Sequence, residues 1–330
     1  MKAQFFGAIA TASALVLALV LAPARSADQS TKVAHIAFLT AESASVSLKP
    51  FSAFRERMRE LGWVEGDNLF IDAHSGDGHT DRLPDLTREA LMRNPDVLVT
   101  GSTPGAIAAK NATRTVPIVA AMGDPLQTGV VSNLARPGGN LTAISTGYTD
   151  GFAGKWLELL LEVVPNAKKV AIIWNLGNPV VKPYRLDLEK VALARGVELR
   201  FVDVRQPDRL QQAFQQAKHD AGVAVVVCEN LFIQNADKVV NLAVQYRMPT
   251  MYCLSRFART GGLIAYGTDL NEMYRRVADY VDKALRGAYV GDLPVQQATK
   301  FELVVNLKTA KALGIRIPES ILVRADEVIR

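Results

Sequence analysis

Short apolar runs alternate with segments of helical period along most of the chain, and this alternation constrains the fold more than any other feature. The apolar runs are Val33–Leu39, Leu69–Ile71, Val97–Val99, Ile118–Ala121, Leu141–Ile144, Val170–Trp174, Val197–Val202, Val223–Cys228, Pro249–Cys253, Leu263–Tyr266 and Phe301–Asn306. Continuous apolar runs of this length are typical of strands buried on both faces of a sheet. Alternating strands and helices are joined by right-handed crossovers and predict an α/β fold with parallel sheets.

Helical periodicity marks the segments between these runs. In Leu48–Leu61, for example, apolar residues recur every three or four positions, and Gly62 follows as a typical end signal. The other predicted helices are Asp81–Arg93, Pro104–Ala112, Pro183–Arg195, Asp208–His219, Ile233–Tyr246, Asn271–Arg286 and Lys308–Leu313. One large sheet would accommodate the strands, but a length of 330 residues favours two domains with a sheet each. The seam between them is predicted near Ser145–Asp150.

Composition narrows the class of protein. With 49% hydrophobic and 22% charged residues, the chain is neither a disordered protein nor a coiled coil. The net charge of +5 comes from interspersed charges, which indicates solubility rather than binding to nucleic acid. The two cysteines, Cys228 and Cys253, end successive predicted strands. They are one candidate disulfide pair, but adjacent parallel strands seldom present the right geometry, so the sequence leaves the pairing open.

The N-terminal segment, residues 1–24, has the pattern of a secretory signal peptide. Lys2 precedes an uncharged stretch, Phe5–Leu21, and the small residues Ala22 and Ala24 suit a cleavage site. A membrane anchor is the alternative, although about 17 apolar residues are at the lower limit for a spanning helix. We therefore expect cleavage near Ala24, a mature protein that begins near Arg25, and export to the periplasm.

Candidate binding residues lie where the predicted strands end, because ligands of open parallel sheets bind beyond the carboxyl ends of the strands. The polar candidates are Thr40, Ser43, Ser45, Ser102, Thr103, Asp124, Asn175, Asn178, Glu229 and Asn230. The aromatic candidates, which could cover a planar ligand group, are Tyr148, Trp174 and Tyr266. For each residue there is a structural alternative: the polar ones could cap helices, and the aromatic ones could pack in a core.

Enzyme signatures are largely absent. The sequence has no Gly-x-Ser-x-Gly elbow, no phosphate-binding loop and no His-Glu-x-x-His motif. The concentration of Asp72, His74, Asp77, His79 and Asp81 could hold a metal, but a solvated connection explains it better, so we predict neither a metal nor a cofactor. His35, inside an apolar run, is predicted to be a core residue with its hydrogen bonds satisfied.

Several motifs resemble those of a bacterial family of ABC-transporter substrate-binding proteins. They are Phe54–Asn68, Thr115–Val119, Gly123–Pro125, Arg136–Thr142, Phe301–Ile315 and Ile317–Ser320. The family is similar to exported binding proteins for tryptophan and other aromatic amino acids. The resemblance implies a type I periplasmic-binding-protein fold, in which two doubly wound lobes are joined by a hinge of three crossovers. It places residues 32–146 and 267–298 in an N-terminal lobe, and residues 147–266 and 299–330 in a C-terminal lobe.

The resulting hypothesis is an exported, monomeric solute-binding component of an ABC importer that performs no chemistry. Its partners would be a small ligand and a membrane permease. An amino-acid-like ligand would place its carboxylate at Ser102 or Thr103 and its ammonium group at Asp124 or Glu229. A secreted two-domain hydrolase or transferase and a ligand sensor for a membrane receptor are the alternatives. A DNA-binding regulator is disfavoured because the export signal occupies the place of a DNA-binding headpiece.

Overall fold

The structure, a computed structural model, describes residues 33–148, 151–178 and 181–330, and within these it describes the side chains except those of residues 44–49 and 182. The predicted signal peptide therefore lies outside the described residues. Two sheets of mostly parallel strands, each with its own hydrophobic core, form the described part of the chain. The predicted α/β fold class is confirmed.

The first sheet has six strands in the order β11-β5-β4-β3-β1-β2, and all its pairs are parallel. Its strands are β1 (Ala34–Thr40), β2 (Leu69–Ser75), β3 (Val97–Thr100), β4 (Ile118–Met122), β5 (Leu141–Ser145) and β11 (Gln296–Gln297). Its helices are α1 (Ala44–Glu60), α2 (Leu83–Met92), α3 (Thr103–Ala112) and α10 (Leu270–Leu285), with a 3-10 turn at Thr80–Arg82 and another at Val290–Asp292.

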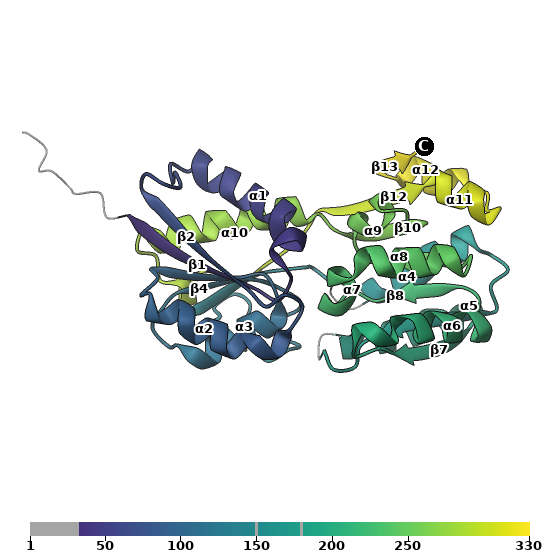
Figure 1. The fold of residues 1–330 in the computed structure, drawn as a ribbon, viewed down its shortest axis with the longest axis horizontal. Helices are drawn as coiled ribbons and strands as arrows, with labels where there is room; N and C mark the ends of the chain where they lie inside the picture. The colour runs from purple at the N-terminus through teal and green to yellow at the C-terminus, as the bar shows by residue number, and fades with distance from the viewer. Residues whose placement is uncertain (1–32, 149–150, 179–180) are drawn as a thin grey trace, which may run out of the picture. The chain divides into compact units, whose positions relative to one another are not determined.

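Alternating side chains of these strands build two separate cores. Ile36 and Phe38 of β1 pack against α1 and α10, whereas Leu39 packs with residues of α2 and α3 on the opposite face. Figure 1 shows α1 beside α10 on one side of the sheet, with α2 and α3 on the other. Strands covered on both faces explain why their sequences read as continuous apolar runs.

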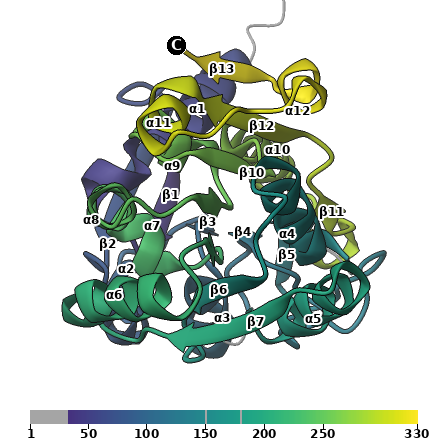
Figure 2. The same ribbon diagram turned by 90° about the vertical axis from the view of Figure 1, so that its right-hand side faces the viewer.

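The second sheet has seven strands in the order β13-β12-β10-β9-β8-β6-β7. Its strands are β6 (Lys169–Trp174), β7 (Glu198–Asp203), β8 (Ala224–Val226), β9 (Thr250–Tyr252), β10 (Ile264–Thr268), β12 (Phe301–Asn306) and β13 (Glu327–Ile329). Its helices are α4 (Phe152–Val163), α5 (Lys182–Arg195), α6 (Leu210–Asp220), α7 (Asn230–Gln234), α8 (Ala236–Gln245), α9 (Ser255–Arg259), α11 (Leu307–Leu313) and α12 (Glu319–Arg324), with a 3-10 turn at Pro207–Arg209. Figure 2 shows α4 and α5 on one side of the strands and α6 and α8 on the other.

Three sequence-based expectations about the fold were wrong. The pair β10–β12 is antiparallel, because the chain enters β12 directly from the other sheet instead of through a covering helix. The helix predicted over Ile233–Tyr246 is two helices, α7 and α8, which are divided at Asn235. In the first sheet, His35 is not satisfied: its Nε2 is buried without a hydrogen-bond partner among the described residues.

The chain passes between the two sheets three times: between β5 and α4, between β10 and α10, and between β11 and β12. The second passage follows Thr268, because β10 continues through Gly267 in the second sheet. The exact lobe boundaries remain a prediction.

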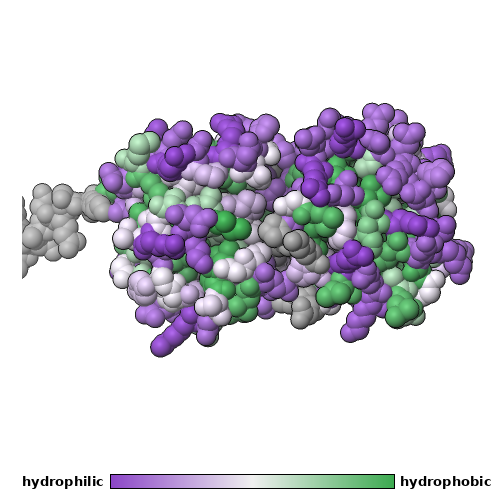
Figure 3. All heavy atoms as spheres, turned by 90° about the horizontal axis from the view of Figure 1, so that it is seen from below, coloured by the Kyte–Doolittle hydropathy of each residue, from purple (hydrophilic) through white to green (hydrophobic). Residues whose placement is uncertain are grey.

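The face of the molecule seen in Figure 3 is mostly hydrophilic, with several groups of apolar side chains among the hydrophilic ones. This pattern agrees with the interspersed charges of the sequence.

Candidate ligand-binding site

A cavity of about 360 Å³ lies where segments from both sheets come together. This volume falls within the range of roughly 300–1,000 Å³ that small-molecule sites occupy. Its lining residues include Glu42, Gly101, Ser102, Thr103, Met122, Thr146, Tyr148, Asn178, Tyr184, Cys228, Glu229, Asn230, Ile233, Leu254, Ser255, Arg256, Asp269, Asn271, Met273 and Tyr274. Carboxyl, hydroxyl, amide, guanidinium and apolar groups thus face one space.

The start of α3 forms one wall of this cavity. The Ser102 Oγ accepts a hydrogen bond from the Gly105 amide at 3.2 Å and caps the helix. The Thr103 Oγ1 accepts a hydrogen bond from the Gly123 amide at 3.1 Å and connects α3 to the end of β4. The free amides at the start of a helix carry partial positive charge, so this wall suits a carboxylate.

Gly101 lets a tyrosine approach the same wall. A β-carbon at this position would collide with the hydroxyl oxygen of Tyr274 from α10. A side chain at position 101 would therefore displace a cavity-lining ring.

Glu229, which is 4% exposed, forms the opposing wall. Its Oε1 accepts a hydrogen bond from the Phe232 amide at 3.2 Å and caps α7, and its Oε2 accepts one from Asn175 Nδ2 at 3.1 Å. Burial raises the pKa of Glu229 to about 7, although these hydrogen bonds oppose the rise. An unpaired charge is costly in a buried site. A cationic ligand group beside Glu229 would therefore stabilise the ionised form of its carboxyl group.

Two further polar atoms of cavity-lining residues have no hydrogen-bond partner among the described residues. They are Nδ2 of Asn230 and Oγ1 of Thr146, and both are buried. Buried polar atoms normally have hydrogen-bond partners, so these two are exceptions, and both belong to residues that line the cavity.

Three tyrosines, Tyr148, Tyr184 and Tyr274, supply the aromatic part of the lining. The Tyr148 hydroxyl donates to the carbonyl of Cys253 at 3.0 Å and accepts from the Thr268 amide at 3.2 Å. Burial raises the pKa of Tyr148 to about 12, and it raises the pKa values of Tyr184 and Tyr274 as well. All three hydroxyls are therefore neutral at physiological pH.

Sequence reasoning missed the charged residues Glu42 and Arg256. The Glu42 Oε2 accepts a 2.5 Å hydrogen bond from Thr40 Oγ1, and burial raises the Glu42 pKa against the opposing effects of Thr40 and Arg256. Glu42 is the second residue after Thr40, which ends the first strand, so the strand-end argument already contained the signal for it. Arg256 lies in the short helix after β9, where no motif marks it.

Of the predicted site residues, Ser102, Thr103, Tyr148, Asn178, Glu229 and Asn230 line the cavity. Whether any of them contacts a ligand remains a prediction. Thr40 and Asn175 are not among the lining residues, but they hydrogen-bond to Glu42 and Glu229, respectively, which are.

The other predicted site residues are not among those that line the cavity. The Asp124 carboxylate accepts from the amides of Leu126 and Gln127 and closes a turn. Trp174 packs against Phe201, with ring centroids 4.5 Å apart, and Tyr266 stacks on Phe152 at 5.4 Å.

Ser43 and Ser45 lie at the start of α1. The Ser43 amide donates to Gln234 Oε1 at 2.8 Å, which joins this segment to α7 of the second sheet. The Ser45 side chain lies outside the described residues.

The cysteine pair is resolved by the structure: Cys228 and Cys253 form a disulfide, with Cα atoms 5.3 Å apart. Geometry did not prevent it, because both residues lie just past the ends of β8 and β9, where the chain is no longer held in the ladder.

The acidic and histidine cluster of β2 makes ordinary polar contacts. His74 Nε2 lies 2.9 Å from an Asp72 oxygen, which also pairs with Arg93 at 3.1 Å. Within the described ranges, no group of three or more His, Cys, Asp or Glu residues is arranged to hold a metal ion.

None of the helices in the described part of the chain is both long and apolar enough to cross a membrane. The chain matches the ABC transporter substrate binding protein family over residues 32–329. The tyrosine-binding protein of Clostridioides difficile (strain R20291) is 26% identical over 269 residues, which are 81% of this chain and 77% of that protein.

Solved structures share the fold. A conserved domain protein from Vibrio cholerae superposes with a TM-score of 0.85 at 28% identity, over 90% of this chain and 100% of that one. An ABC domain from Streptococcus pneumonia in complex with L-Trp has a TM-score of 0.82 at 24% identity, over 90% and 99% of the two chains, and shows the shared fold. With the family match spanning nearly all of its described residues, this chain belongs to the ABC transporter substrate-binding protein family.

Proposed function

We propose that this protein is the exported solute-binding component of an ABC importer and that it takes an aromatic amino acid or a close analogue. The observation that carries this proposal is the cavity of about 360 Å³, which combines a helix N-terminus, a buried carboxyl group and tyrosine rings. The tyrosine-binding relative and the L-Trp complex support the same class of ligand.

The cavity has complementary places for the parts of an amino acid. The ligand carboxylate would accept hydrogen bonds at the start of α3, beside Ser102 and Thr103. The ligand ammonium group would pair with Glu229, which burial alone leaves poorly ionised. The side chain would lie against Tyr148 and Tyr184.

Binding would act by shifting a population. A ligand that touches walls from both sheets stabilises the conformation in which those walls face each other. The permease would recognise that conformation and receive the ligand from it.

The location follows from the predicted signal peptide, which lies outside the described residues. We expect the mature chain to begin at Arg25 and to occur in the periplasmic fraction. N-terminal sequencing of the exported protein tests this expectation, and an intact Met1 in the membrane fraction would contradict it.

Titration calorimetry with L-tryptophan, L-tyrosine and L-phenylalanine tests the ligand class, and mass spectrometry of small molecules released from the purified protein extends the search. We expect one ligand per chain. Loss of a hydrogen bond to a charged group costs about 1.5–3 kcal/mol, so Thr103→Ala and Glu229→Gln should bind roughly 10- to 150-fold more weakly. If no aromatic amino acid binds, or if both variants bind normally and only melt earlier, the ligand class or the site assignment is wrong.

The release of a proton on ligand binding provides a second test. If the ammonium group pairs with Glu229, binding at pH 6 should ionise this residue and release a proton, because its pKa in the free protein is about 7. Calorimetry in buffers of different ionisation enthalpy measures this release. In Glu229→Gln the proton release should disappear.

A further inference from the structure

The Cys228–Cys253 disulfide joins two segments that both carry cavity residues. Cys228 lines the cavity itself, and Glu229 and Asn230 follow it directly. Leu254, Ser255 and Arg256 follow Cys253 and line the cavity as well. The covalent bond therefore lies at the base of one wall.

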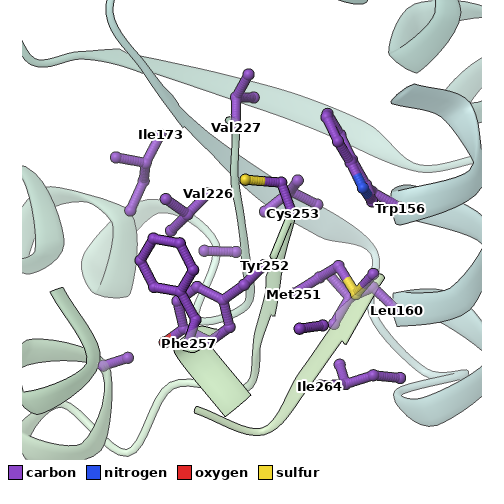
Figure 4. Packing of buried hydrophobic residues seen from close by; sticks show 14 of the residues in the cluster. Trp156, Leu160, Ile173, Val226, Val227, Met251, Tyr252, Cys253, Phe257 and Ile264 are labelled. Carbon is purple, nitrogen blue, oxygen red and sulfur yellow. The ribbon is translucent and has the colours of Figure 1, made fainter. Parts of the chain in front are cut away.

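Cys253 is the fixed end of this bond. It is 1% exposed, and Figure 4 shows it among core residues such as Val227 and Trp156. Its carbonyl accepts the hydrogen bond from the Tyr148 hydroxyl, and it lies so close to Gly267 that a β-carbon there would collide with it.

Cys228 lies beyond the β8–β9 ladder, although the Val227 amide before it still donates to the Ile173 carbonyl of β6 at 3.0 Å. The ladder between β8 and β9 finishes at the pair Val226–Tyr252, two residues before Cys228. Beyond that pair, no backbone hydrogen bond between described residues joins positions 227–230 to positions 253–256. The helix that follows, α7, has five residues and depends on Glu229 for its cap.

We propose that the disulfide is a positioning bond for ligand binding: it ties Glu229 and Asn230 to the anchored Cys253 and so preorganises this wall of the cavity. Preorganisation raises affinity because less ordering remains to be done when the ligand binds. The inference rests on the proposed function for its ligand, and it assigns to the cysteines a role that the sequence left open.

Reduction of the disulfide should weaken ligand binding, because it frees Glu229 and Asn230 from the anchored Cys253. A dithiol would break the S–S bond, convert both cysteines to thiols and close its own disulfide. Because Cys228 is partly exposed on the cavity wall and Cys253 is buried, attack should come from the cavity side. A bound ligand should therefore slow reduction.

The test uses the variant Cys228→Ser/Cys253→Ala, in which alanine avoids placing a hydroxyl in the core. At a temperature where circular dichroism shows the variant folded, we expect L-tryptophan or L-tyrosine to bind about tenfold more weakly, the scale of one hydrogen bond to a charged group. Dithiothreitol should lower the affinity of the parent to that of the variant and leave the variant unchanged. Equal affinities of parent and variant would overturn the proposal.

A matched control separates positioning from stability. Val239→Ala removes buried volume from α8 in the same core while leaving the disulfide intact. It should lower the melting temperature without a comparable loss of affinity. If it weakens binding as much as loss of the disulfide does, the effect is one of stability and the proposal fails.

Hydrogen exchange gives a readout that needs no ligand. Loss of the bond should increase exchange of the amides of residues 229–234 about tenfold, with little change in α6. If the parent binds neither amino acid, the proposed ligand class fails, whereas the positioning role is still decided by this measurement. Unchanged exchange at 229–234, in the variant or in the reduced parent if the variant does not fold, would overturn it.

Discussion

At the scale of single residues, two features of Glu229 favour opposite charge states of its carboxyl group. As the cap of α7 it is stabilised when ionised, because it accepts amide hydrogen bonds, but its burial favours the protonated form. Burial has the larger effect, so the folded protein holds a proton that the unfolded chain would release. Stability should therefore depend on pH in the neutral range.

Replacement of Glu229 by glutamine should remove this dependence. Between its ordinary pKa of 4.5 and its folded value of about 7, the parent becomes less stable as pH rises, by about 1.4 kcal/mol for each unit of pH. Relative to the parent, ligand-free Glu229→Gln should therefore gain stability from pH 5 to pH 8 in chemical denaturation. Glu319→Gln, at an exposed position, is the control and should show no such trend. A stability difference that does not vary with pH would contradict the expected burial effect.

Gly267 tests close packing at the passage between the sheets. In Gly267→Ala the new β-carbon would collide with the Cys253 carbonyl oxygen, which cannot move as a flexible side chain can. Overpacking of this kind costs roughly 1–3 kcal/mol. Gly314→Ala, which has open space but a φ of +71°, should cost only the backbone strain of about 1–2 kcal/mol and leave the cavity intact. We expect Gly267→Ala to alter both the melting temperature and ligand affinity, and Gly314→Ala to alter only the melting temperature.

At the scale of elements, the segments that escaped sequence reasoning have physical explanations. The helix α4 (Phe152–Val163) buries eight of its twelve residues, and its polar face is only the narrow stripe of Lys155, Glu158 and Glu162, so its period is easily overlooked. The break between α7 and α8 depends on Asn235, whose Nδ2 donates to the Leu231 carbonyl. The strands β11 and β13 have two and three residues, too few for any period to show.

The helix α10 supports a prediction about capping. Asp269 accepts hydrogen bonds from the amides of Asn271 and Glu272 and pairs with Lys300 at 2.8 Å. Burial alone would raise its pKa, but Lys300 and the two amides lower it below the ordinary value. Asp269→Ala should cost about 0.5–2 kcal/mol of stability at pH 7 by urea denaturation, as loss of an N-cap does. Because the ionised form is the stabilising one, this cost should shrink as pH falls below 4.

Asp269→Asn is the matched control for that substitution. Asparagine keeps a capping oxygen but loses the charge that pairs with Lys300, so it should retain more stability than alanine. Equal losses in the two variants would show that the ion pair, not the cap, supports α10.

At the scale of the whole molecule, the three passages between the sheets leave the cavity walls on separate cores. Walls carried by separate cores can change their separation without unfolding either core, which is the basis of hinge closure. A saturating ligand at 100 times its Kd adds about 2.7 kcal/mol to the stability of the binding-competent state.

Small-angle scattering should detect this closure. With a saturating amino acid that calorimetry has shown to bind, we expect a smaller radius of gyration than in the ligand-free protein. Glu229→Gln at the same concentration serves as a control for scattering from the added solute and should compact less. No change in the parent at saturation would rule out closure on binding.

The sequence alone was sufficient to locate most strands, the α/β class and two capping residues, Ser102 and Glu229, that also line the cavity. These features depend on local period and on residues that follow a strand end, so neighbours in the chain determine them. The length of the chain favoured two sheets, and the family motifs added the expectation that three passages join them.

Only the tertiary structure decided which strand ends meet. It brought Ser102 and Glu229 to one cavity, placed Trp174 and Tyr266 in aromatic packing, added Glu42 and Arg256, and closed the disulfide. These outcomes depend on the order of strands in each sheet and on contacts between residues far apart in the chain. A local pattern carries no information about such contacts, because the same alternation of strand and helix is compatible with many strand orders.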